Sequence, residues 1–396
     1  MDFSLDTDLE RLKRRTREFV DQIIMPVEAD RTSWDEHENI GLDRLEPLRA
    51  KAKAAGLWAP QTPQALGGMG LSRLGMAVMY EEANRSIFGP VVFNAAAPDD
   101  GNMMLLATAG TAAQQERWLG PIVDGRARSA FAMTEPAPGG GSDPSMIRTS
   151  ARRRDGRWVI EGRKWFITGA GVARHFVLVA RTSDDPRRGL TAFLFDREQP
   201  GWEIVRRIPI MGPEEHGGHC ELVFAGLEVA DENVLLREGD GLKVTQIRLG
   251  PARLTHCMRW LGLARRCLEI AQGYVDERYA FGTRLADRES VQIKLGRVAM
   301  AIEIGRLLVH KAAWKLDQGD RARSDISIAK VQVADTLHLA ADTAIQLQGA
   351  RGYSKDTVAE WIYRYARQAR LVDGASEVHE MVIAKAWSEQ GAEFCA

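Results

Sequence analysis

Two changes of hydrophobic periodicity divide the 396-residue chain into three parts. Before residue 128 and after residue 238, apolar residues recur every three or four positions, as in amphipathic helices. Between them, short β-rich runs alternate with Gly and Asp-Gly turns, too closely spaced for intervening helices. We therefore predict an α+β fold with an N-terminal helical domain (1–127), a central antiparallel β-barrel or sandwich (128–238) and a C-terminal four-helix bundle (239–396).

The N-terminal part contains several helix signals. A helix over residues 9–24 is expected to end or bend at Pro26, because proline lacks a backbone N–H. A second helix over residues 42–55 is expected to stop at Gly56, and Pro47 is expected to move its start to a later residue. Two more helices are predicted over residues 72–85 and 112–119.

The central and C-terminal parts differ in the length of their elements. Asp155-Gly156 separates two apolar runs, which is a strong hairpin signal. Eight strands are predicted, at residues 130–134, 146–154, 158–161, 165–168, 176–180, 191–195, 202–206 and 221–224. Four bundle helices are predicted, with apolar faces over residues 257–275, 291–302 and 331–344 and a last helix over 357–370.

Composition excludes several classes of protein. The formal net charge of −1 gives no reason to expect a nucleic-acid partner. No run of about 18 apolar residues occurs, so we expect no membrane span. The N-terminus has no apolar signal segment, and the four cysteines form no CxxC pair. These features predict a cytoplasmic protein.

The stretch from Phe131 to Asp143 combines an apolar run with a glycine-rich loop. Pro136 ends the predicted strand, because it cannot donate to a sheet ladder. Three consecutive glycines, Gly139 to Gly141, precede Ser142. Glycines let a backbone approach a ligand closely. A ligand loop and a flexible surface loop explain these residues equally well.

Three other features favour no specific site. Residues 169–174 resemble a dinucleotide fingerprint, but a strand rather than the required helix follows. His216 and His219 lack further ligands at metal spacing, so we predict polar loop residues and no metal. Arg265 and Arg266 are expected on a solvated helix face.

Several separated motifs together resemble the acyl-CoA dehydrogenase family over nearly the whole chain. They are Thr134-Glu135-Pro136 with the following Gly-Ser-Asp loop, residues 162–169 (GRKWFITG), 220–224 (CELVF), 277–282 (ERYAFG) and 346–353 (QLQGARGY). The resemblance implies a flavoprotein with FAD held between the β domain and the bundle. The implied cofactor-binding residues are Phe131, Met133, Thr134, Gly141, Ser142, Phe166, Thr168, Arg278, Phe281, Gln346, Gly349, Ala350, Ala375 and Glu377.

The resemblance also assigns parts of the flavin to these residues. Phe166 would lie against the isoalloxazine ring, and Thr168 would hydrogen-bond near its reactive nitrogen. Arg278, Phe281 and residues 346–350 would contact the ADP half from a neighbouring subunit. This arrangement implies a homo-oligomer, usually a tetramer, and an electron-transfer flavoprotein as the electron acceptor.

The family's catalytic base is usually a glutamate, but here the matching residue is Asp373. Three explanations of this aspartate remain open. Asp373 is the working base for an acyl-CoA, or it removes a proton from another acidic C–H as in the related nitroalkane-oxidising enzymes, or the active site has weakened activity. The family's other base position is Ala252 here and offers no substitute. Ser142, Arg253 and Gly374 are the implied substrate-binding residues. His256 and Arg259 either extend a cationic lining towards the substrate or are ordinary helix-surface residues.

Three departures from the family pattern affect this transfer of roles. The loop before Ser142 is two residues longer than usual, Ala375 lacks a hydroxyl, and Val372 replaces a bulky aromatic residue. The predicted function is FAD-dependent α,β-dehydrogenation of an acyl-CoA, as in fatty acid β-oxidation. The alternatives are a flavin oxidase or monooxygenase acting on a non-CoA substrate, and a non-catalytic DNA-associated member of the family.

Overall fold

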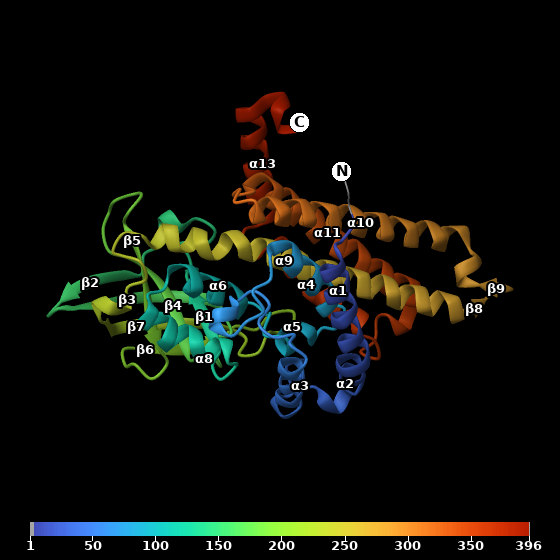
Figure 1. The fold of residues 1–396 in the computed structure, drawn as a ribbon, viewed down its shortest axis with the longest axis horizontal. Helices are drawn as coiled ribbons and strands as arrows, with labels where there is room; N and C mark the ends of the chain where they lie inside the picture. Colours follow the sequence, from blue (N-terminus) through green and yellow to red (C-terminus); the bar gives the residue numbers. More distant parts are fainter. Residues whose placement is uncertain (1–3, 396) are drawn as a thin grey trace.

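The computed structural model describes residues 4–395 and contains a helical layer, a curled sheet and a bundle of long helices (Figure 1). The N-terminal helices are α1 (Thr7–Phe19), a π-helical turn (Val20–Ile24), α2 (Met25–Ala29), α3 (Leu42–Ala54), α4 (Arg73–Ala83), α5 (Gly89–Val92), α6 (Asp99–Ala109), α7 (Ala112–Gln114) and α8 (Gly120–Val123). Of the described helices, none is both long and apolar enough to cross a lipid bilayer.

Proline affects these helices less than expected. Pro26 lies in the first turn of α2, where the missing N–H costs little, so the chain stays helical to Ala29. Pro47 lies inside α3, and the prediction that it delays the helix start is wrong. The first turn is already closed before Pro47, because the N–H groups of Arg44 and Leu45 both donate to the Gly41 carbonyl.

The central sheet has seven strands, which Figure 1 shows gathered at one end of the molecule. They are β1 (Ser129–Ala132), β2 (Ser150–Arg154), β3 (Arg157–Thr168), β4 (His175–Arg181), β5 (Leu190–Asp196), β6 (Trp202–Arg207) and β7 (His219–Val229). Their order is β1-β4-β2-β3-β7-β6, with β5 paired to β4. Most pairs are antiparallel, including the β2–β3 hairpin around Asp155-Gly156, but β1 runs parallel to β4. Two of the predicted strands form the single strand β3.

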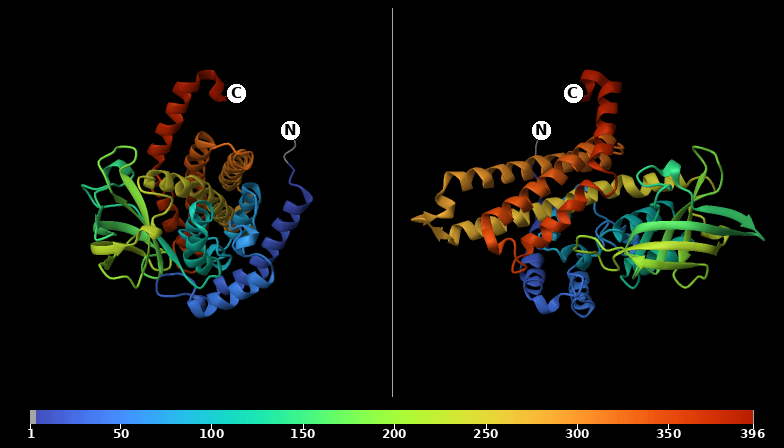
Figure 2. Two further views of the ribbon diagram at one scale, coloured as in Figure 1. Left: turned by 60° about the vertical axis from the view of Figure 1, so that its left-hand side comes forward. Right: turned by 180° about the vertical axis from the view of Figure 1, so that it is seen from behind.

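The C-terminal bundle is built on α9, whose 37 residues span roughly 55 Å. A small hairpin, β8 (Tyr279–Ala280) and β9 (Thr283–Arg284), connects α9 (Gly241–Glu277) to α10 (Glu289–Asp317). The chain continues through α11 (Arg323–Gln348), α12 (Val358–Ala366), a 3₁₀ turn (Arg367–Arg370) and α13 (Ser376–Gln390). The sequence did not predict α13, which projects from the body of the molecule (Figure 2).

The apolar core has two main parts. One cluster runs through the N-terminal helices and the bundle, and includes Tyr80, Phe93 and Trp260. A second lies inside the sheet and includes Phe176, Phe193 and Phe195. The helical parts at the two ends of the sequence therefore pack against each other and share one core.

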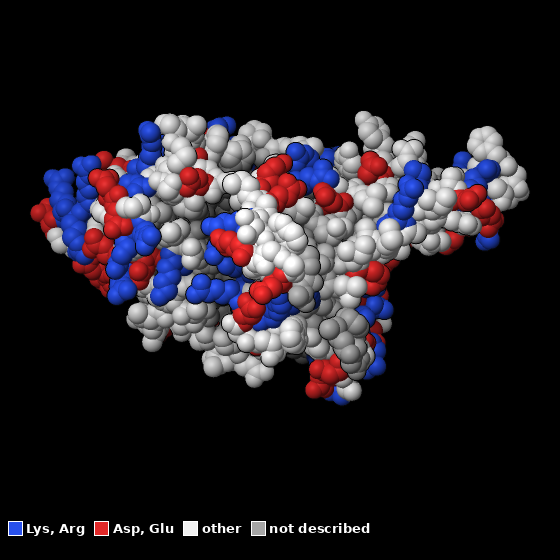
Figure 3. Space-filling model, turned by 90° about the horizontal axis from the view of Figure 1, so that it is seen from above, with Lys and Arg blue, Asp and Glu red and all other residues white. Residues whose placement is uncertain are grey.

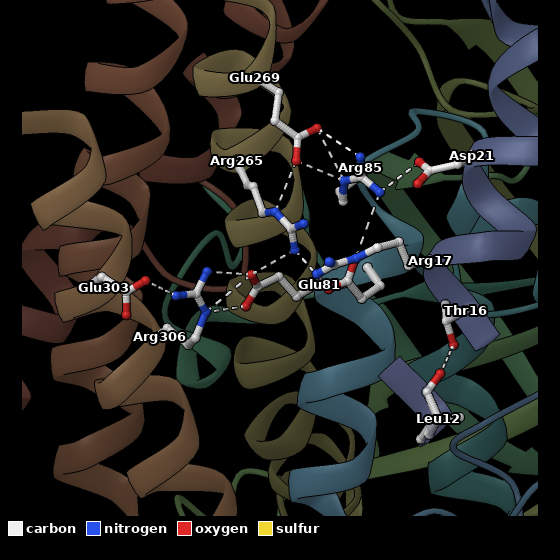
Figure 4. A network of polar contacts seen from close by, with 11 residues as sticks. Leu12, Thr16, Arg17, Asp21, Glu81, Arg85, Arg265, Glu269, Glu303 and Arg306 are labelled. Carbon is white, nitrogen blue, oxygen red and sulfur yellow. Dashed lines mark hydrogen bonds and ion pairs between the residues drawn. The ribbon is translucent and has the colours of Figure 1, made fainter. Parts of the chain in front are cut away.

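An ion-pair network that includes Arg265 joins these helical parts (Figure 4). The contacts of Arg265 and of its neighbour Arg266 show that the prediction of a solvated helix face for these two residues is wrong. The Arg265 side chain is only 19% exposed and lies 2.8 Å from Glu82, which is itself buried. Arg266 is 23% exposed and pairs with the buried carboxylate of Glu28. Neither arginine lies on a solvated face, because N-terminal helices carrying these acids cover this side of α9.

Candidate active site

The turn at Asp373 and Gly374 is fixed by side chains from three helices. Both residues have positive φ, 52° and 103°, and Gly374 tolerates this conformation because it lacks a Cβ. Arg253 Nε on α9 donates to the Asp373 carbonyl at 2.8 Å, and Lys330 Nζ on α11 donates to the Gly374 carbonyl at 2.8 Å. His379 Nε2 on α13 lies 3.3 Å from the Asp373 carbonyl. The turn therefore has a fixed position relative to the bundle.

The Asp373 side chain lies among cationic groups of α9. Its Oδ2 is 3.3 Å from His256 Nε2 and 3.9 Å from Arg248 NH1. Burial works to raise the pKa of Asp373, but the contact with His256 and the charges of Arg248 and Arg253 outweigh it and lower the pKa from its usual value. Oδ2 is buried, and its contact with His256 lacks the geometry of a hydrogen bond, so that it has no hydrogen-bond partner among the described residues. Such an atom is uncommon and often belongs to a functional site.

A buried polar chain continues behind His256. Its Nδ1 lies 3.2 Å from Arg259 NH2, and its ring stacks on Trp260 with centroids 5.2 Å apart. Arg259 NH1 is 2.6 Å from the carboxylate of Asp100 on α6, which is almost fully buried. Thr255 also donates to Asp100 at 2.9 Å. Arg259 therefore lies in the interior and anchors His256, rather than lining a surface.

The first predicted flavin strand reaches the same region. The guanidinium of Arg248 lies over the ring of Phe131, 5.3 Å from its centroid, and its Nε donates to Asn102 at 3.1 Å. Arg248 is buried and touches both the end of β1 and the Asp373 carboxylate. The structure thus brings Phe131 and Asp373 close to the same arginine.

The loop after β1 is held by a buried ion pair. Glu135 accepts from the backbone N–H groups of Arg148 and Thr149 at 2.7 and 2.9 Å. Lys164 Nζ lies 2.8 Å from Glu135 Oε1 and donates to the Met133 carbonyl at 2.8 Å. Burial lowers the pKa of Lys164 to about 8, although Glu135 works to raise it.

The tip of this loop faces outwards. Ala137 and Pro138 are exposed, and the loop closes beneath them through a bond from Glu135 N to Gly140 O at 2.7 Å. Gly141 and Ser142 are also exposed, and a Cβ on Gly141 would meet no atom within 4 Å. Space therefore exists for a ligand beside these two residues.

The second predicted flavin segment presents an exposed aromatic ring. Phe166 lies at an irregularity of the β3–β7 pairing, has a φ of 51° and is 43% exposed. Thr168 Oγ1 lies 3.0 Å from His219 Nδ1, and His219 Nε2 lies 2.9 Å from Glu215. His216 Nε2 lies 2.9 Å from the carbonyl of Ile40. Both histidines therefore have polar partners within the fold.

The predicted ADP-binding residues lie far from Asp373 within one chain. Arg278 and Phe281 belong to the β8–β9 hairpin, at the end of the molecule opposite the sheet (Figure 1). Phe281 is 97% exposed and has a φ of 53°. Gln346, Gly349 and Ala350, at the end of α11, are also exposed. Ala375 and Glu377, in contrast, follow directly on the Asp373 turn at the start of α13.

The sequence analysis missed Arg248, Lys330 and His379. Arg248, His256 and Arg259 lie at positions i, i+8 and i+11 of one helix, and therefore share a face. The basic face that these three residues form on α9 was the signal that could have identified Arg248. Lys330 and His379 act on backbone carbonyls far away in the sequence and left no comparable signal.

Comparisons with known proteins agree with this architecture. The N-terminal, middle and C-terminal domain models of acyl-CoA dehydrogenases match residues 6–126, 130–227 and 239–387. The chain is 36% identical to the FadE2 protein of Mycobacterium tuberculosis, named as an acyl-CoA dehydrogenase, over 98% of this chain and 97% of that protein. It is also 36% identical to mouse acyl-CoA dehydrogenase family member 10 over 96% of this chain, but spans only 37% of that protein's length.

Solved structures give the same result. A protein from Mycobacterium abscessus, named as an acyl-CoA dehydrogenase, superposes with a TM-score of 0.91 at 34% identity, covering 98% of this chain and 100% of that one. Butyryl-CoA dehydrogenase from Megasphaera elsdenii superposes with a TM-score of 0.84 at 29% identity, covering 98% and 100%. The chain therefore belongs to the acyl-CoA dehydrogenase family.

Proposed function

We propose that this protein is an FAD-dependent acyl-CoA dehydrogenase in which Asp373 removes the α proton of the acyl thioester. The observation that carries the proposal is the Asp373 carboxylate itself. It lies on a turn fixed from three helices, and its partly buried side chain has Oδ2 3.3 Å from His256 Nε2. Arg248 and Arg253 hold its pKa low together with His256, so the residue is ionised at neutral pH, as a base must be.

The residues at the predicted flavin-binding positions suit a flat, partly apolar cofactor. Phe166 offers an exposed ring, Phe131 lies under Arg248, and the loop at Gly141 and Ser142 is open. An aromatic face stacks well on a flat ring, and the family's members bind FAD. Bound FAD would supply the acceptor for the hydride that leaves the β carbon. The proton would go to Asp373, and the product would be a trans-2-enoyl-CoA.

The decisive experiment follows the absorbance of bound flavin under anaerobic conditions with a panel of acyl-CoAs of varied length and substitution. We expect at least one acyl-CoA to bleach the wild-type flavin. Asp373→Asn should slow that bleaching by about 10²- to 10⁴-fold. Glu380→Gln, which changes an exposed carboxylate on the following helix, α13, should leave the rate unchanged.

Each part of the proposal has its own negative result. No bleaching by any acyl-CoA would refute the dehydrogenase, whereas unchanged bleaching in the Asp373 variant would refute only the base. An acyl-CoA without β hydrogens, 3,3-dimethylbutanoyl-CoA, isolates the proton step. Exchange of its α hydrogens in D₂O should depend on Asp373 although no hydride can leave.

We further propose that the active form is a homo-oligomer, in the family's usual manner a tetramer. Arg278 lies 25 residues beyond Arg253, which holds the Asp373 turn, or roughly 38 Å along α9, and this separation supports a role for Arg278 and Phe281 at a flavin bound to another subunit. The bundle also exposes large apolar side chains, as expected of an interface. On α10 these are Ile293, Met300, Ile304, Leu307 and Trp314. Light scattering coupled to size-exclusion chromatography should give a mass of several chains, and a monomer would refute the proposal.

Electrons are proposed to leave to an electron-transfer flavoprotein. Adding that protein to the acyl-CoA-reduced enzyme should reoxidise the flavin much faster than air does. Rapid reoxidation by oxygen alone would instead indicate an oxidase. Acidic and basic side chains alternate over the face drawn in Figure 3, so that face offers no basic surface for DNA.

A further inference from the structure

We propose that His256 is a positioning residue whose Nε2, 3.3 Å from Asp373 Oδ2, keeps this oxygen in place and so leaves Oδ1 to take the substrate proton. The inference rests on the proposed function, since it assigns a role to a neighbour of the proposed base. It is carried by a chain of four side chains, Asp100, Arg259, His256 and Asp373, that runs from the core of the N-terminal part to the turn.

The chain fixes which imidazole nitrogen carries the proton. A guanidinium can only donate, so the contact of 3.2 Å from Arg259 NH2 requires His256 Nδ1 to accept. The ring proton is therefore on Nε2, which lies 3.3 Å from Asp373 Oδ2. His256 thus presents a donor nitrogen, and no acceptor, to the carboxylate.

The position of His256 is itself fixed from two directions. Arg259 donates to Asp100 at 2.6 Å and to the Ala95 carbonyl at 3.0 Å, and the Arg259 and Asp100 side chains are both buried. The imidazole also stacks on Trp260 one turn further along α9, with an interplanar angle of 25°. The Nε2–H therefore has a defined direction before any substrate binds.

The same geometry assigns different roles to the two oxygens of Asp373. Oδ2 is buried, yet the whole side chain keeps 19% of its surface exposed. The exposed area must therefore fall on the other side-chain atoms, which include Oδ1. A carboxylate held at one oxygen cannot rotate freely, so Oδ1 stays directed at its target. Displacements of about 1 Å can cost about 100-fold in rate.

A pair of amide substitutions separates the two contacts of His256. A glutamine places its terminal nitrogen near the position of Nε2 and can donate to Asp373. An asparagine ends near Nδ1 and can accept from Arg259, but does not reach Asp373. With the acyl-CoA that bleaches the wild-type flavin fastest, we expect His256→Asn to slow bleaching by about 100-fold with little change in KM. His256→Gln should stay within about threefold of the wild type.

A second measurement needs no substrate. Melting temperatures of the wild type, H256N, D373N and the double variant form a thermodynamic cycle. We expect H256N to lower Tm less in the D373N background than in the wild type, because its partner is already neutral. Flavin content of each variant, read from absorbance, shows whether the site has kept its fold.

The outcomes are distinct from those of the proposed function. If D373N abolishes bleaching while H256N and H256Q both match the wild type, the positioning role is wrong and the base assignment stands. Equal loss in H256Q and H256N, with flavin content kept, would also refute the donor role. Strictly additive Tm shifts would contradict the contact itself.

Discussion

Replacing Glu135 by Gln tests how much the buried Glu135–Lys164 pair contributes to the fold. The two side chains are 3% and 0% exposed. Oε1 accepts from Lys164 and Thr149, and Oε2 accepts from Arg148. A glutamine must point its NH₂ group at one of these sets of donors, so either orientation opposes donor to donor. Because removal of one partner from a buried pair typically costs 3–5 kcal/mol, we expect about 3 kcal/mol at pH 7.

The loss should depend on pH in a defined direction. The pKa of Lys164 is about 8 in the folded protein, and Glu135 contributes to keeping it that high. Without Glu135 the folded-state pKa falls further, so the variant releases this proton at lower pH than the wild type. Its deficit should therefore shrink by up to about 1.4 kcal/mol per pH unit as pH rises towards 8, and then level off.

Guanidinium denaturation of the FAD-loaded protein between pH 6 and 9, followed by circular dichroism, measures both effects. Glu161→Gln, on the exposed side of β3, is the matched control and should stay within about 0.5 kcal/mol of the wild type. Glu135→Gln should also release FAD more readily than the wild type, because the Lys164 side chain that it disturbs donates to the Met133 carbonyl. A Glu135 variant as stable as the control, or a deficit that does not change below pH 8, would refute the reasoning.

Two further predictions concern the Asp373 turn. Gly374→Ala adds a Cβ at a φ of 103° and 3.1 Å from His379 Nε2, so Tm should fall by the equivalent of about 1–3 kcal/mol and flavin bleaching should slow. Gly273→Ala, where a Cβ on α9 meets no atom within 4 Å, should instead gain about 0.5–1 kcal/mol. Burial and the charges of Arg253 and Lys330 lower the pKa of His379 from 6.5 to about 4. Because the unfolded chain binds this proton first, acidification from pH 6.5 towards 4 should cost about 1.4 kcal/mol per unit. Denaturation curves at pH 7 and pH 5 should show a smaller acid loss in His379→Gln, and an equal loss would count against the assignment.

Hydrophobic periodicity was sufficient for the order of helical, β and helical parts, and for the long bundle helices. Periodicity did not predict the correct strand boundaries where a charged side chain is buried. Lys164 separates two apolar runs and was therefore placed between strands, yet it is fully buried against Glu135 inside β3. It also failed for α13, where His379 is the buried residue among those described and no apolar face exists to reveal the helix.

Only those residues of the candidate site that belong to short local motifs could be predicted from the sequence. Asp373, Gly374 and Phe131 follow from short sequence patterns, and the structure brings Phe131 and Asp373 to the same arginine. That arginine, Arg248, is 125 positions from Asp373, and no local pattern connects them. Side-chain contacts between distant elements depend on how the helices pack, and a single sequence does not specify that geometry.

The length of α9 has a consequence for mixtures of defective chains. If each flavin is bound by Asp373 of one subunit and Arg278 of another, a D373N chain and an R278A chain carry complementary defects. In a symmetric mixed dimer, one site would combine both substitutions and the other would combine neither. Two inactive proteins, unfolded and refolded together in equal amounts, should then recover about a quarter of wild-type activity. Such interallelic complementation would be impossible if every site were complete within its own chain.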